Sequence, residues 1–275
     1  MMARLFLFLL LCSSSLMGGI IHRKSYPTVC DFSITSFPSK FNPAQMSPGC
    51  SVYVQKTCLD EFFQEVFPQI QTPFVLVTAV GIGNIDETYL PYLESNLVLH
   101  WFATLAGINH PKLTALPLGV PERVADESTF TIPTSSAPFF APKPNSIFVN
   151  WRNTHPVRRQ LTKYFKQLDG AFVCGIVPFQ VYLNLIAESR FIISPPGIDP
   201  DCYRTWETLY LGSIPVVGSY ETDQVYADLP VIIVPDLGQV TESSLEAALT
   251  QLEGQTFNWQ KLNLAYWANQ FSSFR

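Results

Sequence analysis

The sequence predicts an α/β protein made of two units, each with a parallel β-sheet, that face one another across a cleft. The 275 residues are 47% hydrophobic and only 14% charged, which is enough apolar material to fill a large core. From residue 146 onward, strand-like apolar runs alternate with helical segments, the pattern of a parallel sheet covered on both faces. A segment rich in proline, serine and threonine at 121–145 separates this half from earlier strand-like runs. Two such units imply a cleft at the carboxyl ends of the strands, where α/β sheets bind ligands.

The first residues have the layout of an export signal. Arg4 precedes a continuous apolar run at 5–11, and small residues follow it up to Gly19. This pattern predicts a segment at 1–21 that acts as a signal peptide or stays as a signal anchor, with a buried helix or strand as the remaining alternative. We therefore expect an exported protein, or one in the Golgi or ER lumen or the periplasm, with membrane association if the segment is an anchor.

The first unit, at 22–140, begins with a proline-, serine- and cysteine-rich region at 25–58 that shows little periodicity. After it, apolar β-favouring runs predict strands, and amphipathic runs predict short helices. The strands are expected at 74–80, 97–102 and 113–120, and the helices at 59–67 and 86–93.

The second unit, at 141–275, has the more regular alternation. Beyond the strand–loop–helix–strand stretch at 190–217, strands are expected at 146–151, 171–177 and 231–234, and helices at 156–168, 178–188, 245–252 and 259–271.

The stretch at 190–217 carries most of the functional information. A buried strand is followed by Pro195, Pro196 and Gly197, which break the chain. Asp199 is expected to cap a helix whose first residue is Pro200, and that helix is expected to stop at a glycine, residue 212.

On this helix Arg204 and Glu207 are neighbours one turn apart. A helix N-terminus backed by an arginine suits a phosphate group. An Arg–Glu pair on the surface of an ordinary crossover helix is the alternative, and the spacing alone does not separate the two.

Two more arginines lie near the same edge of the predicted sheet. Arg152 follows the strand at 146–151, and Arg158 lies near the start of the next helix. Both are placed to reach a diphosphate in the crevice beside the 190–217 stretch. The alternative is a solvated basic helix start, which the helix dipole disfavours.

The polar groups of the first unit are less informative. Asp86 and Glu87 follow a Gly-Ile-Gly turn and are expected to face the cleft, where either is a candidate general base or a charge that complements a helix N-terminus. His100 and His110 are expected to be satisfied core or loop residues rather than bases.

Several classes of site are disfavoured. The chain has no CxxC or Cys/His spacing typical of zinc, and no Walker, Gly-x-Ser-x-Gly or DxD motif. With 17 basic and 22 acidic residues and no basic stripe, nucleic acid is not an expected partner. Cys30, Cys50 and Cys58 lie close together in the sequence and are expected to supply one disulfide.

Several of these motifs resemble the exostosin-like glycosyltransferases. The resemblance covers most of residues 70–217 in patches and is strongest over 182–217. It rests on Leu99-His-Trp-Phe102, His110-Pro-Lys-Leu-Thr-Ala-Leu-Pro-Leu-Gly119, Tyr182-Leu183, Glu188-Ser-Arg-Phe191, Ser194-Pro-Pro-Gly197, Asp201-Cys-Tyr-Arg-Thr-Trp-Glu207 and Gly212-Ser-Ile-Pro-Val-Val217.

The resemblance implies a GT-B-like fold of two Rossmann-like units, with a nucleotide-sugar donor bound mainly by the second. It implies that Arg204 contacts the diphosphate, that Glu207 holds ribose hydroxyls, and that Ser194 and Gly197 lie in the loop that approaches the donor. The closing aromatic segment at 259–271 is similar to the C-terminal helix that such folds pack back across the cleft. Enzymes of this fold usually need no metal, so neither a metal nor another cofactor is expected. Tyr203 stands where close relatives are expected to have histidine.

The resulting hypothesis is a glycosyltransferase that moves a sugar from a nucleotide donor to a hydroxyl of a glycan or glycoconjugate, with inversion and with Asp86 as the base. One alternative is an exported, non-catalytic protein that binds sugar or nucleotide. Another is a two-lobed binding protein of the periplasmic type, which has no need of the Arg204 and Glu207 pair.

Overall fold

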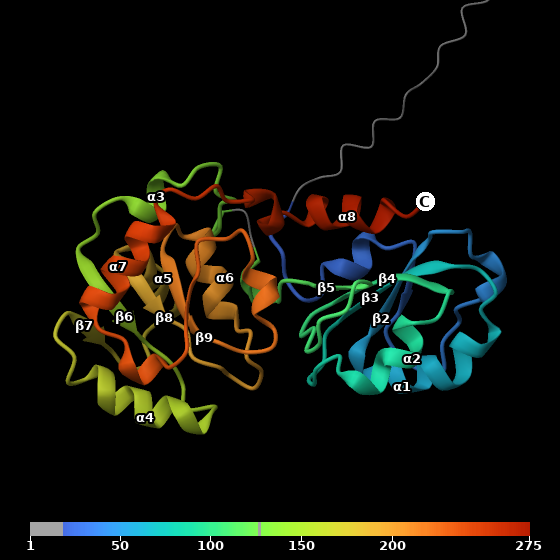
Figure 1. Cartoon of the computed structure of the whole chain (residues 1–275), viewed down its shortest axis with the longest axis horizontal. Helices are drawn as coiled ribbons and strands as arrows, with labels where there is room; N and C mark the ends of the chain where they lie inside the picture. Colours follow the sequence, from blue (N-terminus) through green and yellow to red (C-terminus); the bar gives the residue numbers. More distant parts are fainter. Residues whose placement is uncertain (1–18, 126–127) are drawn as a thin grey trace, which may run out of the picture.

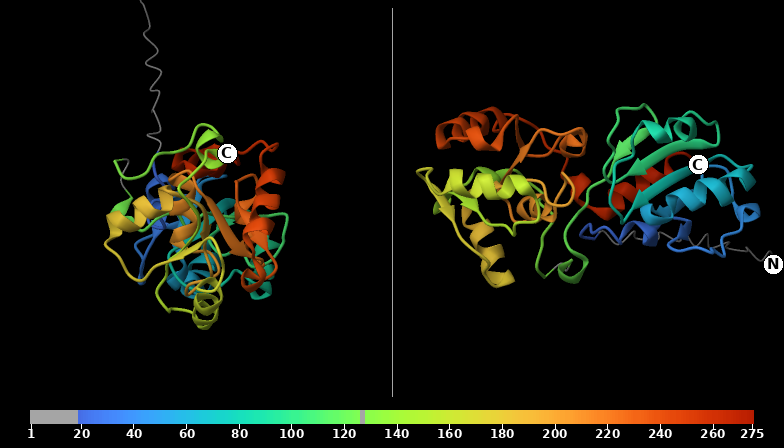
Figure 2. Two further views of the ribbon diagram at one scale, coloured as in Figure 1. Left: turned by 90° about the vertical axis from the view of Figure 1, so that its left-hand side faces the viewer. Right: turned by 90° about the horizontal axis from the view of Figure 1, so that it is seen from below.

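A computed structural model describes residues 19–125 and 128–275 as two lobes lying side by side (Figures 1 and 2). Each lobe has one five-stranded sheet, and every strand pairing in both sheets is parallel. The predicted fold class, an α/β chain with two parallel sheets in a GT-B-like arrangement, is confirmed.

The sheet of the first lobe runs in sequential order, with each strand beside the next one in the chain. Crossovers of one hand between sequential strands leave helices on one face only, so the other face needs a cover from elsewhere. That cover is the C-terminal helix α8, Leu264–Ser272, together with the N-terminal segment at 20–29. Figure 1 shows α8 lying along the upper side of this lobe. The other elements are β1 Phe32–Ile34, β2 Ser51–Gln55, α1 Leu59–Glu61, β3 Phe74–Ala79, α2 Leu90–Leu93, β4 Val98–Ala103 and β5 Leu113–Ala115.

Alternating apolar side chains let the central strand pack on both faces at once. On β3, Val75 and Val77 pack in the cluster that contains Trp267 and Phe271 of α8, whereas Leu76 belongs to the cluster on the opposite face. All of these side chains are buried. The C-terminal helix is therefore part of the core of the first lobe.

The second lobe has a doubly wound sheet in the order β7-β6-β8-β9-β10. Successive crossovers leave β6 and β8 toward opposite faces, so the loops after these adjacent strands diverge at their carboxyl ends, and we call the position between these two loops the crevice. The elements of this lobe are α3 Ala137–Phe140, β6 Asn145–Val149, α4 Pro156–Phe165, β7 Ala171–Val173, α5 Phe179–Ala187, β8 Ser189–Ile193, α6 Tyr203–Tyr210, β9 Ile214–Gly218, β10 Ile232–Val234 and α7 Glu242–Leu252.

Three expectations about local structure are corrected. Strands β1 and β2 lie in the region at 25–58, which shows little periodicity and where we predicted no strand. Helix α6 begins at Tyr203, with Cys202 at the N-cap position, and not at Pro200. Asp199 therefore does not cap it. Cys30, Cys50 and Cys58 are all free thiols, so the expected disulfide does not form in this structure.

The expected boundaries of the two units are also shifted. Ile20 and Ile21 are buried in the folded body, and the backbone N–H of Ile21 donates to the hydroxyl of Tyr210 at 3.0 Å. The segment predicted as a leader at 1–21 therefore reaches into the fold at its end, while residues 1–18 lie outside the described residues. Helix α8, which we assigned to the second unit, packs on the first sheet. Within 19–125 and 128–275, no helix is long and apolar enough to cross a membrane.

Candidate functional site

The crevice between β6 and β8 is built from two loops, at 150–155 and 194–202, that follow these adjacent strands. Arg204 and Glu207, which we singled out from the sequence, lie on α6, directly after the loop at 194–202. The structure thus brings Arg152, Arg158 and Arg204 to one edge of the second sheet, as parallel strands require of residues that follow their carboxyl ends.

Arg158 ties the two loops together. Its guanidinium donates to the carbonyl oxygens of Pro196 at 2.8 Å and Pro195 at 3.0 Å in one loop, and to the carbonyl of Arg152 and the hydroxyl of Thr154, both at 2.9 Å, in the other. The side chain is only 6% exposed. Because its donors are used within the protein, Arg158 shapes the crevice, and the direct diphosphate contact that we expected of it stays a prediction.

Ser194 and Gly197 also support the loop at 194–202 from within. The buried Ser194 hydroxyl lies 2.9 Å from that of Thr205 on α6, which joins the loop to the helix. A Cβ placed on Gly197 would lie 3.3 Å from the Arg158 guanidinium, so any larger residue crowds that group. Both residues hold the loop in place, and the Ser194 hydroxyl has its partner inside the protein.

Arg204, on the first turn of α6, has an unusual position. Its Nε atom is buried without a hydrogen-bond partner, and its guanidinium makes no ion pair with any residue that the structure describes. The nearby Arg158 is also cationic, and burial first and then Arg204 lower the pKa of Arg158. A half-buried guanidinium beside a second one, with no carboxylate bound to it, is a site that favours an anion.

Glu207, one turn further along α6, is 4% exposed and is not the surface partner of Arg204. Its Oε2 accepts a hydrogen bond of 2.8 Å from the hydroxyl of Tyr182 on α5. Burial raises the pKa of Glu207, while the Tyr182 hydrogen bond and the Arg204 charge act in the opposite direction. The surface-pair alternative for Arg204 and Glu207 is therefore wrong.

Arg152 is exposed, and among the described residues its side chain makes no hydrogen bond or ion pair. Its place in the loop after β6 is set by the bond that its carbonyl accepts from Arg158. Arg152 is thus held at the rim of the crevice with its guanidinium available.

The first lobe contributes Lys56, which we did not identify from the sequence. It follows β2 directly, donates to the carbonyl of Gly83 at 2.5 Å, and interacts electrostatically with Asp199 of the second lobe. Burial lowers the pKa of Lys56 to about 8 and raises the pKa of Asp199. Its signal in the sequence was weak, because the strand before it is only five residues long in a region without periodicity.

A cavity of about 540 Å³ lies between the lobes on this side. Asn84 from the loop after β3 lines it, together with Pro200 and the residues 219–222 that follow β9. Its size is ordinary for a small-molecule site, and it lies at the carboxyl ends of strands from both sheets. The interlobe cleft predicted from the sequence therefore has a cavity at its expected edge.

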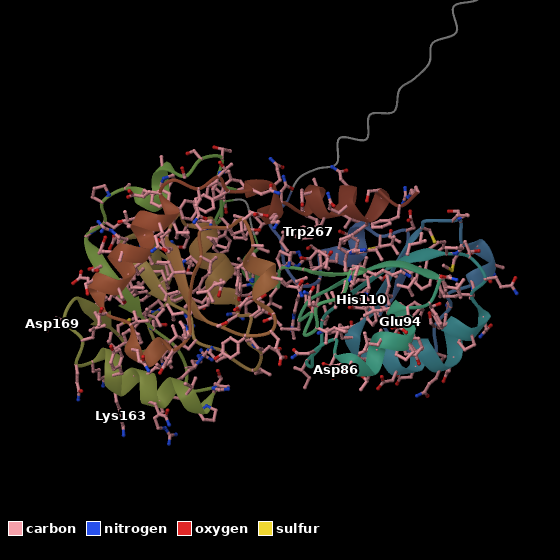
Figure 3. The ribbon with its side chains drawn as sticks, in the orientation of Figure 1. Asp86, Glu94, His110, Lys163, Asp169 and Trp267 are labelled. Atoms are coloured by element: carbon pink, nitrogen blue, oxygen red, sulfur yellow. The ribbon has the colours of Figure 1, made fainter. Side chains whose placement is uncertain are left out.

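Asp86, the predicted base, caps a short 3₁₀ turn. Its Oδ1 accepts hydrogen bonds from the backbone N–H of Thr88 at 3.0 Å and from the Thr88 hydroxyl at 2.5 Å. Figure 3 places it at the lower edge of the first lobe. This is the capping alternative that the sequence left open, and a catalytic role stays a prediction.

Asp201 links the lobes. One oxygen accepts a hydrogen bond of 3.1 Å from the backbone N–H of Leu118 in the first lobe, and the carboxyl also accepts from Trp206 and Tyr226 in the second. Burial raises its pKa to about 7 against these hydrogen bonds.

This pKa makes a prediction for stability. Between the ordinary carboxyl pKa of 3.8 and about 7, the folded protein keeps a proton on Asp201 that the unfolded chain releases. Asp201 therefore makes the free energy of unfolding fall as the pH rises through this window, by at most about 1.4 kcal/mol per pH unit. Asp201→Asn removes this contribution. Urea unfolding of both proteins from pH 4 to 8 should show a less negative pH slope in the variant, and equal slopes would contradict the assignment.

Within the described ranges, no group of three or more His, Cys, Asp or Glu side chains is arranged to hold a metal ion. The charged groups that converge on the crevice are instead arginines, with Lys56 across the cleft.

Comparison with known proteins gives little beyond this geometry. No family model matches the chain, and no curated protein matches it significantly. Among the solved structures, a chain of the crystal structure of the GtfA/B complex aligns with 12% identity and a TM-score of 0.36. The alignment covers 83% of this chain and 55% of that one, so the chain spans about half the length of that structure.

Proposed function

We propose that this protein is a glycosyltransferase that binds a nucleotide-sugar donor in the crevice between β6 and β8. In this proposal the donor diphosphate lies against Arg204, with Arg152 at the rim, and Glu207 binds the ribose hydroxyls. The acceptor, a hydroxyl of a glycan or glycoconjugate, enters from the cavity between the lobes. The sequence resemblance over 182–217 supports the same roles for Arg204 and Glu207.

One observation carries the proposal. The Arg204 guanidinium has no partner in the described protein although its Nε is buried. Leaving a charged donor desolvated and unpaired costs free energy, and such a cost is retained where a ligand supplies the missing acceptor. The position, at the switch point of a doubly wound sheet, is where such folds bind nucleotides.

The chemistry needs few protein groups. The acceptor oxygen forms a bond to the anomeric carbon, the bond from that carbon to the diphosphate oxygen breaks, and its electron pair leaves with the diphosphate. Arg204 and Arg152 stabilise the charge that develops there. The proton of the acceptor hydroxyl passes to a carboxylate in the cleft, for which Asp86 and Asp199 are the two candidates. Loss of transfer with retained donor binding in Asp86→Asn or in Asp199→Asn separates them.

Export through the segment at 1–21, as a signal peptide or signal anchor, remains part of the proposal and is supported by the apolar run at 5–11.

A thermal-shift screen against nucleoside diphosphates and their sugar conjugates tests the proposal. A ligand that binds only the folded protein stabilises it by an amount that grows with the logarithm of its concentration over its dissociation constant, and so raises the melting temperature. We expect stabilisation by one nucleoside diphosphate and by its sugar conjugates, followed by transfer to a hydroxyl acceptor. Stabilisation without transfer or hydrolysis indicates the non-catalytic binding protein. No stabilisation by any nucleotide would overturn the proposal.

A further inference from the structure

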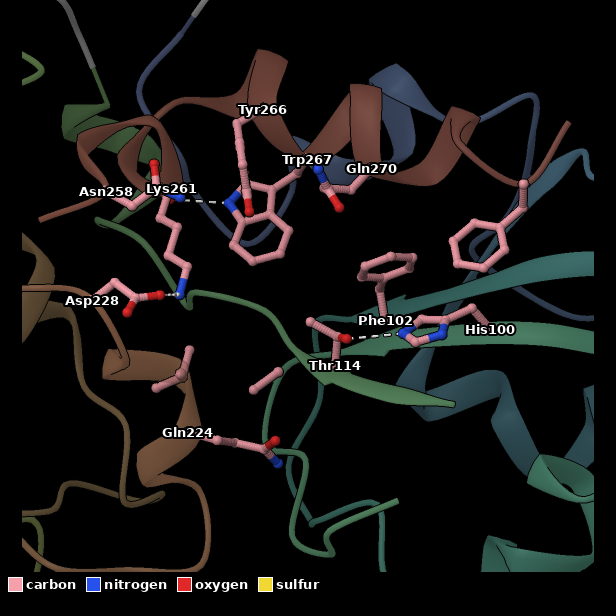
Figure 4. A pocket seen from close by; sticks show the side chains of 13 residues that line it. His100, Phe102, Thr114, Gln224, Asp228, Asn258, Lys261, Tyr266, Trp267 and Gln270 are labelled. Atoms are coloured by element: carbon pink, nitrogen blue, oxygen red, sulfur yellow. Dashed lines mark hydrogen bonds and ion pairs between the residues drawn. The ribbon is translucent and has the colours of Figure 1, made fainter. Parts of the chain in front are cut away.

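A second cavity lies away from the crevice, on the face of the first sheet that α8 covers. It measures about 380 Å³ and is lined by β4, β5, α8 and the segments at 224–228 and 258–261 of the second lobe. Figure 4 shows these elements surrounding it. Residues 219–222, just before the 3₁₀ turn Asp223–Tyr226, line the interlobe cavity, whereas Gln224 and Val225 of the turn line this second cavity.

Gln224 lines the second cavity and reaches the first lobe. Its amide nitrogen donates to the carbonyl of Ala106 in the first lobe at 3.3 Å. The two cavities share no lining residue, so the second cavity is a separate site.

Aromatic side chains form the walls of this cavity and are held in fixed positions. The rings of Tyr266 and Trp267 meet edge to face at 5.0 Å, and Phe102 meets Trp267 in the same way at 6.5 Å. The indole N–H of Trp267 donates to the carbonyl of Lys261 at 3.0 Å, which fixes the ring. Phe102 and Trp267 are buried and hold Tyr266, whose ring is partly exposed at the cavity. A rigid aromatic ring binds a ligand at a low cost in entropy.

The charges around the cavity cancel. Lys261 forms an ion pair of 2.9 Å with Asp228, shown as a dashed line in Figure 4. Burial lowers the pKa of His100 to about 4, so its ring is neutral at pH 7, and its Nε2 lies 2.8 Å from the Thr114 hydroxyl. An anionic ligand therefore finds no unpaired cation among the described residues that line this cavity.

Uncharged hydrogen-bonding groups remain. The amide of Gln270 and the hydroxyl of Tyr266 line the cavity, and neither makes a hydrogen bond with a described residue. A wholly apolar ligand would bury these groups without partners, which costs free energy. A ligand with one apolar face and several neutral hydroxyl groups satisfies both the rings and the amide.

We propose that this cavity binds a neutral saccharide unit, with a sugar face against the aromatic walls and hydroxyls on Gln270 and Tyr266. The volume of the cavity lies within the range of small-molecule sites. That this saccharide is a distal unit of the acceptor glycan rests on the proposed function, whereas the binding itself does not.

Titration of the full chain with neutral trisaccharides, followed by tryptophan fluorescence and calorimetry without nucleotide, tests this inference. The probes are cellotriose, xylotriose, mannotriose, galactotriose and chitotriose. We expect saturable binding of at least one, with a dissociation constant on the order of 1 mM, a value typical of weak small ligands. Addition of a nucleoside diphosphate should not compete.

The variants Tyr266→Ala and Gln270→Ala should each weaken this binding about tenfold, equivalent to about 1.4 kcal/mol. Tyr220→Ala, which alters only the interlobe cavity, is the matched control and should bind as the wild type does. Gln270→Ala removes no packed ring, so its saccharide affinity tests the inference even if Tyr266→Ala fails to fold. The inference is overturned if no trisaccharide binds saturably, or if both variants bind as tightly as the wild type. Because no nucleotide is present, this result is separate from failure of the proposed donor site.

Discussion

Replacing Arg204 with alanine is expected to weaken the binding of a nucleoside diphosphate about 100-fold, because a pair of charge-assisted hydrogen bonds is lost. The same change should not lower the free energy of unfolding, since the guanidinium has no partner in the described protein. Arg204→Lys keeps the charge but not the planar fork, so its affinity should lie between those of wild type and alanine variant. Calorimetric titration gives the affinities, and urea unfolding gives the stabilities.

Arg190→Ala is the matched control for Arg204. Arg190 lies at the start of β8 and forms a partly exposed ion pair with Glu246. Its loss should leave the affinity unchanged and lower the stability by at most about 1 kcal/mol. Equal affinity in Arg204→Ala and wild type would contradict the role of Arg204. A large loss of stability in Arg204→Ala would show that the guanidinium serves the fold.

Replacing Arg158 with alanine is expected to lower the free energy of unfolding by about 3 kcal/mol, because buried carbonyl oxygens lose their donors. Those of Pro195 and Pro196 lie in one loop of the crevice, and that of Arg152 lies in the other. With the brace removed, the loops separate and nucleotide affinity falls as a secondary effect. Urea unfolding at pH 7 measures the first change, and titration the second.

The neighbouring arginine on α4 offers a close control. Arg159 is exposed, and Arg159→Ala should change the free energy of unfolding by no more than about 0.5 kcal/mol. If Arg158→Ala proved as stable as Arg159→Ala, the loops would not depend on the brace. Loss of affinity without loss of stability in Arg158→Ala would instead restore the direct diphosphate contact first predicted for this residue.

Much of the fold was predictable because apolar runs and chain breakers follow simple rules. The run at 74–80 became the buried strand β3, and the alternation after residue 146 became the doubly wound sheet. Strands β1 and β2 were not predicted, because they are short and lie among prolines and cysteines. In such a region, pairing partners far away in the chain decide the structure.

The candidate site was only partly predictable from the sequence. Spacing alone placed Arg204 and Glu207 on one helix, but it could not show that one is unpaired and the other is buried against Tyr182. The sequence could not show that Arg158 braces two loops, because that role depends on the carbonyl directions of those loops. Lys56 comes from the other lobe, so no local pattern connects it to the crevice.

The covering of the first sheet by α8 also depends on parts of the chain that lie far from the helix in the sequence. The resemblance indicated that the helix at 259–271 packs back across the cleft. The sheet face that it covers depends on the sequential strand order, which is a property of the whole sheet. The second cavity follows from this arrangement, since its aromatic walls come from α8.

The central claim is that a nucleoside diphosphate binds in the crevice between β6 and β8 against Arg204. A crystal structure of the full chain with the stabilising nucleoside diphosphate tests it most directly. We expect the diphosphate within hydrogen-bonding distance of the Arg204 guanidinium, about 3 Å, and the ribose hydroxyls at Glu207. A nucleotide bound elsewhere, with Arg204 still unpartnered, would contradict the account.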